Sequence, residues 1–163
     1  MVKSLLVTLI LLGAGATAAQ EEDADASNLQ TLVPFGASWL YRASPERAPD
    51  NWTSPGFDDA VWQQGQAQLG YGDGDEATAV TPNLVSYLFR HRFSVQNPDN
   101  ISRLVLELLY DDAAIVYLNG QEIYRTSLMP EGTPDRFTTA TDHVPVDNLI
   151  DEVTLNAAAR HLT

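Results

Sequence analysis

The dipeptide Asn119-Gly120 constrains the fold of this chain more than any other sequence feature. It separates two short stretches with alternating apolar residues, 115–118 and 121–125. Both residues of an Asn-Gly pair tolerate a positive φ angle, and the type I′ turn that they form matches the twist of antiparallel strands. The sequence therefore predicts a β-hairpin, preceded by the aspartate pair Asp111-Asp112, and with it an antiparallel β-protein.

Two longer stretches before the hairpin also alternate, and we expect them to be neighbouring strands joined by the polar turn 96–100. In residues 86–95 one face carries Tyr87, Phe89, His91, Phe93 and Val95. In residues 101–110 one face carries Leu104, Leu106, Leu108 and Tyr110. Residues 147–159 allow two interpretations, a helix favoured by three consecutive alanines or a shortened strand.

The N-terminus has the three parts of a secretory signal peptide. Lys3 is followed by an apolar run, residues 5–12, and by a stretch of small residues that offers cleavage after Ala18 or Ala19. The apolar run is too short to cross about 30 Å of hydrocarbon, so a membrane anchor is disfavoured. We expect residues 1–19 to be a signal peptide and the protein to be secreted or periplasmic.

Residues 20–28 are acidic and contain no large apolar side chain, so we expect a disordered leader. Residues 29–163 then form one module of single-domain size. The chain has no cysteine, so no disulfide stabilises it. Its net charge of −13 repels phosphate backbones and anionic lipids, which argues against nucleic-acid and membrane partners.

Five motifs occur in an order that resembles a known family of β-sandwich modules. They are Trp52, residues 56–62 (GFDDAVW), residues 69–75 (LGYGDGD), residues 87–90 (YLFR) and residues 111–120 (DDAAIVYLNG). The family is the galactose-binding-like jelly roll, known as the N-terminal sugar-binding domain of family 2 glycoside hydrolases. The chain is also similar to accessory modules beside metallophosphoesterase domains in secreted bacterial proteins. The resemblance spans residues 29–142 and implies an antiparallel jelly-roll β-sandwich that binds carbohydrate.

Two departures from the family pattern stand out. Ala113 follows the aspartate pair where the family has glycine. The family closes its sandwich with a late strand of the pattern Gly-x-Asn-x-apolar-x-apolar, which residues 144–163 do not contain. We therefore expect the sandwich to lack its last strand, and the sequence to be an N-terminal piece of a longer protein.

The resemblance implies a ligand site on the loops at one rim of the sandwich. Asp111 and Asp112 would accept hydrogen bonds from sugar hydroxyls, although an aspartate in a bend also suits capping of backbone N–H groups. Trp52 and Tyr71 lie in loops and are candidates for stacking on a sugar ring, with core packing as the alternative. Asn119 of the turn completes the predicted ligand-binding set.

Three carboxylates, Asp73, Asp75 and Glu76, follow one another closely in a glycine-rich loop. Such a cluster of hard oxygen ligands suits a structural Ca²⁺ ion. The alternative is a solvated acidic turn, because acidic loops are common in a chain of this charge.

No catalytic motif is recognisable. The chain has no Gly-x-Ser-x-Gly elbow, phosphate loop, His-Glu-x-x-His pair or cysteine nucleophile, and no spacing places two carboxylates across a cleft. We expect a non-catalytic accessory module that binds a neutral glycan within a larger secreted protein, beside a further domain. The alternative is a structural spacer that packs against a neighbouring catalytic domain, such as a metallophosphoesterase, and binds no small ligand.

Overall fold

The computed structural model of the chain describes residues 4–13, 29–72, 74–134, 138–142 and 149–162. The predicted cleavage site, the acidic leader 20–28 and Asp73 lie outside these residues. Nearly all regular structure in the described part is β-strand, and the helical elements are the short 3-10 turns η2 (Pro98–Asn100) and η3 (Ala158–His161). The expected all-β class is therefore confirmed.

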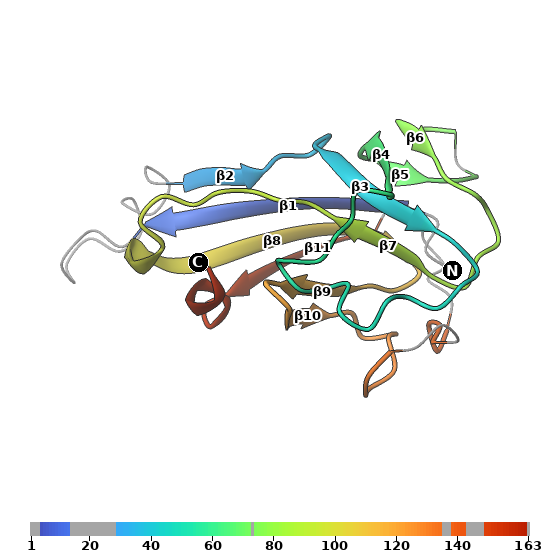
Figure 1. The fold of residues 1–163 in the computed structure, drawn as a ribbon. Coiled ribbons are helices and arrows are strands. Elements are labelled where there is room, and N and C mark those ends of the chain that lie inside the picture. The colour runs from blue at the N-terminus through green and yellow to red at the C-terminus, as the bar shows by residue number, and fades with distance from the viewer. Residues whose placement is uncertain (1–3, 14–28, 73, 135–137, 143–148, 163) are drawn as a thin grey trace.

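The largest sheet has the strand order β11-β8-β1-β5-β6, and β2 also pairs with β1. Its strands are β1 (Ser4–Gly13), β2 (Leu29–Val33), β5 (Leu69–Gly70), β6 (Thr78–Ala79), β8 (Ile101–Asp111) and β11 (Leu149–Leu155). All neighbours are antiparallel except the short pair β5 and β6. Figure 1 shows that β1 and β8 run side by side along the length of the molecule.

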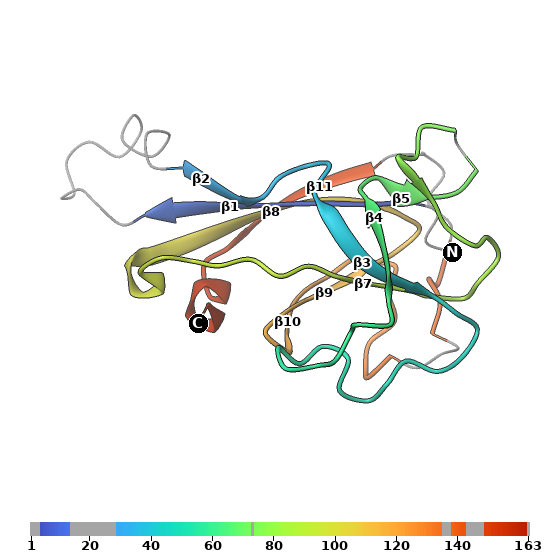
Figure 2. The ribbon, with the colours of Figure 1, turned by 45° about the horizontal axis from the view of Figure 1, so that its top comes forward.

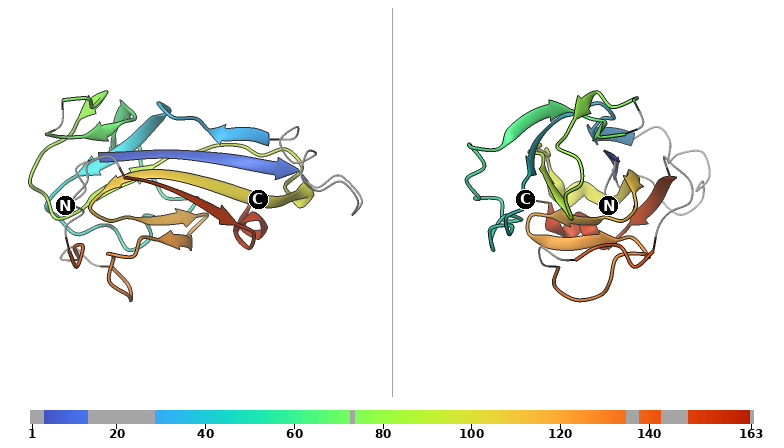
Figure 3. Two further views of the ribbon diagram at one scale, coloured as in Figure 1. Left: turned by 180° about the vertical axis from the view of Figure 1, so that it is seen from behind. Right: turned by 90° about the vertical axis from the view of Figure 1, so that its right-hand side faces the viewer.

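Two smaller sheets lie across from this one. One has the order β4-β3-β7, and the other is the hairpin of β9 and β10. Their bounds are β3 (Ser38–Ala43), β4 (Gln63–Gln66), β7 (Tyr87–Arg90), β9 (Ile115–Leu118) and β10 (Gln121–Arg125). Figures 2 and 3 show these strands as a second layer, with the largest sheet as the first. The sheets are small and do not close on one another.

The core lies between the two layers. The predicted apolar face of β8 is confirmed, because Leu104, Leu106 and Leu108 are at most 1% exposed. Trp39 of β3 packs against all three apolar clusters of the interior, so a single residue links the second layer to the core along its length.

The predicted hairpin is also confirmed. Asn119 and Gly120 have φ angles of 49° and 84°, the two positive values that a type I′ turn requires. Gly120 lies close to another loop, since a Cβ atom on it would lie 3.8 Å from the carbonyl oxygen of Thr53.

One segment differs from the sequence-based expectation, and another decides between two interpretations that the sequence allows. The strand expected over residues 86–95 ends at Arg90 and pairs with β3, so the expectation that it neighbours the strand over residues 101–110 is wrong. Phe93 and Val95 beyond it still pack against the core. The alternation of apolar and polar side chains therefore continues beyond the last residue that pairs with another strand. For this reason the sequence pattern predicts a strand that is longer than β7. Residues 149–155 form strand β11 because they pair with β8 along Leu104–Tyr110, and this excludes the helical interpretation there.

Strand β1 lies inside the segment expected to be a signal peptide. The apolar run of residues 5–12 suits a leader and a sheet strand equally well, and the sequence pattern alone does not distinguish the two. Removal of residues 1–19 on export stays a prediction. Within the described residues, none of the helical segments has the length and apolar character needed to cross a membrane.

Candidate functional site

The loop between β3 and β4 is organised by aromatic rings. Trp62 lies against Trp52 in a stacked arrangement, with ring centroids 6.3 Å apart, and meets Phe57 edge-on at 5.7 Å. Trp52 also meets the ring of Tyr117 on β9 edge-on at 5.8 Å. These contacts hold the loop against the β9–β10 hairpin.

A buried ion pair holds the same loop against β7. Asp59 is 5% exposed, and its two carboxylate oxygens accept hydrogen bonds from Arg90 Nε at 2.8 Å and Arg92 Nη1 at 2.7 Å. Arg90 also donates to the backbone carbonyls of Trp52 and Ser54. Its guanidinium lies 5.2 Å from the centre of the Phe57 ring, within the range of a cation–π contact. Arg90 therefore contacts four residues of the loop and holds the loop against β7.

The Asp59 carboxyl is charged in this setting. Burial works to raise its pKa, but the hydrogen bonds and positive charges of Arg92 and Arg90 outweigh burial and hold the pKa below the ordinary value of 3.8. Two guanidinium groups and one carboxylate leave one positive charge in the cluster. The side chain of Arg92 is 55% exposed, so this charge reaches the surface of a chain with net charge −13.

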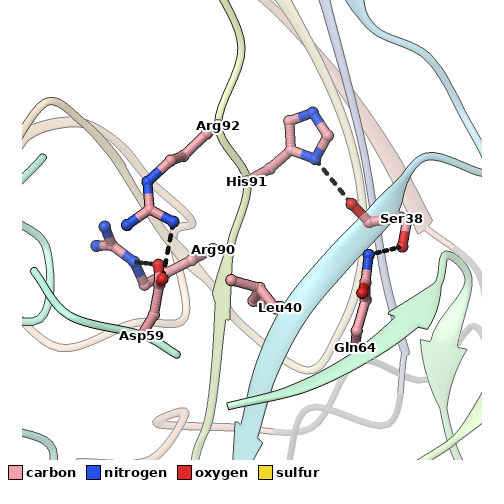
Figure 4. Close-up of a pocket in the computed structure, with 7 residues that line it drawn as sticks. All are labelled: Ser38, Leu40, Asp59, Gln64, Arg90, His91 and Arg92. Carbon is pink, nitrogen blue, oxygen red and sulfur yellow. Dashed lines mark hydrogen bonds and ion pairs between the residues drawn. The ribbon is translucent and has the colours of Figure 1, made fainter. Parts of the chain in front are cut away.

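A small depression of about 130 Å³ lies between this cluster and the edge of β3. Figure 4 shows Leu40 between two polar groups, with Arg90, Arg92 and Asp59 on one side and Ser38 with Gln64 on the other. His91 Nδ1 lies 2.9 Å from the carbonyl oxygen of Ser38, to which it donates as N–H. Gln64 Nε2 donates to Ser38 Oγ at 3.0 Å. The nitrogen-bearing side chains of the depression thus already donate to acceptors within the protein, and the exposed side chain of Arg92 reaches the surface.

A larger cavity, of about 680 Å³, shares Arg90, His91 and Arg92 with the depression. The rings of Trp39, Trp52 and Tyr117 line it, together with backbone and side chains of β7, β9 and the loops beside them. This volume lies within the usual range of about 300–1,000 Å³ for small-molecule sites. Trp39 Nε1 is buried and has no hydrogen-bond partner in the described part of the chain, which leaves an N–H donor beside the cavity.

Of the five predicted ligand residues, Trp52 and Asn119 line this cavity. The amide of Asn119 donates to the carbonyl oxygen of His161 at 2.7 Å, which connects the hairpin turn to η3. Tyr71 lies elsewhere, with its ring 6.1 Å from that of Tyr87, and does not line the cavity.

Asp111 and Asp112 are not on an open rim. They are 2% and 6% exposed, at the end of β8. A carboxylate buried this deeply needs partners within the protein, which favours a structural role for both residues over contact with a sugar. The burial follows from the position of β8 between β11 and β1, which the sequence pattern around Asp111 does not show.

The predicted Ca²⁺ site is described only in part, because Asp73 lies outside the described residues. Asp75 accepts a hydrogen bond from Gln68 Nε2 at 3.5 Å, and Glu76 accepts one from the backbone N–H of Gly74 at 3.0 Å. Among the residues that the structure describes, no three histidine, cysteine, aspartate or glutamate side chains gather closely enough to hold a metal ion. Calcium binding stays a prediction.

A second polar cluster ties the two layers together. The hydroxyl groups of Tyr110 on β8 and Tyr124 on β10 both donate to Asp151 Oδ2 on β11, at 3.0 and 2.6 Å. Burial, followed by the hydrogen bond and the charge of Asp151, raises the pKa of Tyr110 to about 12 and raises that of Tyr124 as well.

The ion-pair cluster was missed by sequence reasoning. Arg90 and Arg92 do alternate onto the face opposite the aromatic residues, so the pattern places them together. Their partner, however, lies 31 and 33 residues away in a loop, where no periodicity applies. The nearest sequence signal is the aspartate pair Asp58-Asp59 beside Trp62.

Comparison of the chain with protein-family models, with curated proteins and with solved structures finds no match.

Proposed function

We propose that this chain is a non-catalytic binding module and that its ligand is a carbohydrate held in the 680 Å³ cavity. The observation that carries the proposal is the composition of the cavity wall. Aromatic rings, which suit the C–H faces of sugars, lie beside nitrogen donors, which suit hydroxyl groups. Trp39 lines the cavity and carries an indole N–H that is buried and has no partner among the described residues.

The absence of catalysis is proposed from the carboxylates. Among the described residues of the cavity wall the one carboxylate is Asp50, which pairs with Arg47 at 2.6 Å. Asp59 of the neighbouring depression is held by two arginines. Most glycoside hydrolases use two carboxyl groups on opposite sides of the scissile bond, one of them able to give up a proton.

The proposal extends to the architecture and the setting of the module. Its three sheets, antiparallel except for the short pair β5 and β6, are compatible in their two layers with a galactose-binding-like jelly roll, and the apolar N-terminus is compatible with export. In this proposal the module accompanies a further domain of a secreted or periplasmic protein.

The spacer alternative finds less support. A surface that packs against a neighbouring domain is expected to present a contiguous apolar patch. The large apolar side chains exposed among the described residues come from four separate segments: Phe35, Val61, Val85 and Ile150.

Tryptophan fluorescence tests the proposal directly, because Trp39 and Trp52 line the cavity and Trp62 stacks on Trp52. The chain is titrated with neutral and with uronate-containing oligosaccharides, and we expect a saturable change with at least one of them. Folded protein whose emission responds to none at about millimolar concentration, the weak end of specific affinities, would refute carbohydrate binding.

A matched pair of variants locates the site. Thr139 is exposed and lines the cavity, so Thr139→Phe is expected to weaken binding about tenfold, or about 1.4 kcal/mol. Thr154 is exposed on β11 and does not line the cavity, so Thr154→Phe is expected to leave binding unchanged. Equal effects of the two substitutions would place the ligand elsewhere.

A further inference from the structure

Strand β1 connects two parts of the largest sheet. All ten of its residues pair with β8, from Ser4 opposite Asp111 to Gly13 opposite Ile101. On its other side, residues 9–12 pair with β2, and Ser4 and Leu5 pair with β5. In the described part of the chain, β2, β5 and β6 join β8 only through β1 (Figure 1).

The same ten residues contain the apolar core of the predicted signal peptide. Cleavage after Ala18 or Ala19 would remove β1 from the exported protein entirely. The sheet would then have a gap one strand wide between β8 on one side and β2 with β5 on the other.

Removal of β1 would leave one long edge of β8 without a neighbouring strand. β8 would keep β11 as its one neighbour, and its backbone N–H and C=O groups on the β1 side would lose their partners over residues 101–111. This stretch of β8 carries Leu104, Leu106 and Leu108, which are each at most 1% exposed. Leaving the edge open would expose both unpaired backbone groups and apolar surface.

We propose that the place of β1 is a strand-acceptor site, and that in the exported protein it takes an extended apolar segment from a partner polypeptide, antiparallel to β8. The chemistry of the segment follows from the occupant seen here. Residues 4–13 are uncharged, nearly all apolar, and pair along the whole of β8. Backbone hydrogen bonds supply affinity in this mode of recognition, and alternate side chains supply specificity.

The exported protein provides the first test. Intact mass shows whether the leader has been removed, and a labelled peptide of the sequence SLLVTLILLG, with lysines added at both ends for solubility, is titrated by fluorescence anisotropy. We expect saturable binding, and about tenfold slower amide exchange over residues 103–111 in its presence. A peptide of the same length with prolines at its fourth and seventh positions is expected not to bind, because the N–H groups of these positions point to opposite sides of the strand and proline removes both.

The full chain, produced without export so that the leader stays attached, provides a second test that does not depend on recovery of the processed form. Leu9 pairs with Leu106 of β8 and with Val33 of β2. Leu9→Pro removes a backbone donor in the middle of β1 and introduces a ring that a strand between two others does not accommodate, so it is expected to open the site to the peptide. Leu9→Val keeps the backbone donor and is expected to leave the site closed.

Three results would overturn the proposal. One is an exported protein that keeps residues 4–13, since the site would then never be vacant. Another is a processed protein whose β8 amides are already protected without peptide, which would mean that β2 or another segment has closed the gap. The third is failure of the Leu9→Pro chain to bind the peptide.

Discussion

Arg90 and Asp59 form an ion pair at 2.8 Å, with the side chain of each less than one tenth exposed. The pair joins β7 to a loop 31 residues earlier in the chain, and the remaining donors of Arg90 bind the carbonyls of Trp52 and Ser54 in the same loop. The position of Trp52 at the cavity therefore depends on a charge pair that contacts no ligand.

Replacing Asp59 by asparagine is expected to destabilise the protein by about 3–5 kcal/mol, because it leaves buried guanidinium charge without a carboxylate. Urea unfolding followed by tryptophan emission measures the loss. Asp58→Asn is the matched control, since Asp58 is exposed and accepts one hydrogen bond, from the N–H of Ala60. A similar loss in both variants would mean that the ion pair does not hold the loop.

The effect of Asp59 on stability is expected to depend on pH in one direction. Its pKa in the folded protein lies below the ordinary 3.8, so its contribution is fully present above that pH and is lost as the pH falls through the lower, folded-state value. The difference in unfolding free energy between the wild type and Asp59→Asn should accordingly shrink below about pH 4. A difference that stays constant in acid would contradict this assignment.

Tyr124→Phe is expected to cost about 1.5–3 kcal/mol at neutral pH, since it removes a hydrogen bond to the Asp151 carboxylate. A raised tyrosine pKa stabilises the folded state below the unfolded value of 10.0, and this contribution is lost as the pH rises through the folded-state value, about 12 for Tyr110. The wild type should thus lose stability between about pH 10 and 12 more steeply than Tyr124→Phe, as measured by chemical unfolding. Equal slopes would show that the cluster is not formed in solution.

Gly65→Ala is expected to destabilise by about 1–3 kcal/mol, because overpacking forces neighbouring atoms to shift. A Cβ atom at this position would lie 2.6 Å from Oγ1 and 2.9 Å from Cβ of Thr78 on β6. Thermal unfolding measures the cost. The double variant with Thr78→Gly should recover part of it, and a double variant no better than the sum of its single changes would exclude this contact as the cause.

Asn119 allows the turn geometry and the side-chain contact to be separated. Asn119→Gly keeps a residue that accepts positive φ and loses the side-chain bond to His161, so a cost of about 0.5–1.5 kcal/mol is expected. Asn119→Ala adds about 1–2 kcal/mol, because alanine is strained in the left-handed region that the turn requires. Unfolding free energies of the two variants test this prediction, in which Asn119→Ala is the less stable of the two. The reverse order would contradict it.

The sequence predicts the elements whose side chains alternate and whose turns have a distinctive chemistry. The buried face of β8 and the hairpin at Asn119 follow from those two signals. What the pattern does not contain is pairing between distant segments. Asp59 contacts Arg90 because of the path of a loop, and β1 pairs with β8 although nearly a hundred residues separate them. Neither contact produces a periodic pattern in the sequence.

Candidate ligand residues were harder to predict for a related reason. Residue type identifies Trp52 and Asn119 as suitable, and both line the cavity, but it equally suggests Asp111, which is buried. The difference depends on which strands flank each position, and the Asp-Asp pair looks the same in a loop at the rim as it does at the end of a central strand.

Strand β11 forms the outer edge of the largest sheet in the described part of the chain, and it carries Asp151 and Glu152 beside the exposed Ile150. Two molecules that approach along this edge bring like charges together, which opposes aggregation by strand pairing. Salt screens this repulsion, and acid near the isoelectric point of about 4.3 removes the overall charge that reinforces it. Acid or high salt is thus expected to weaken one barrier to strand pairing between molecules.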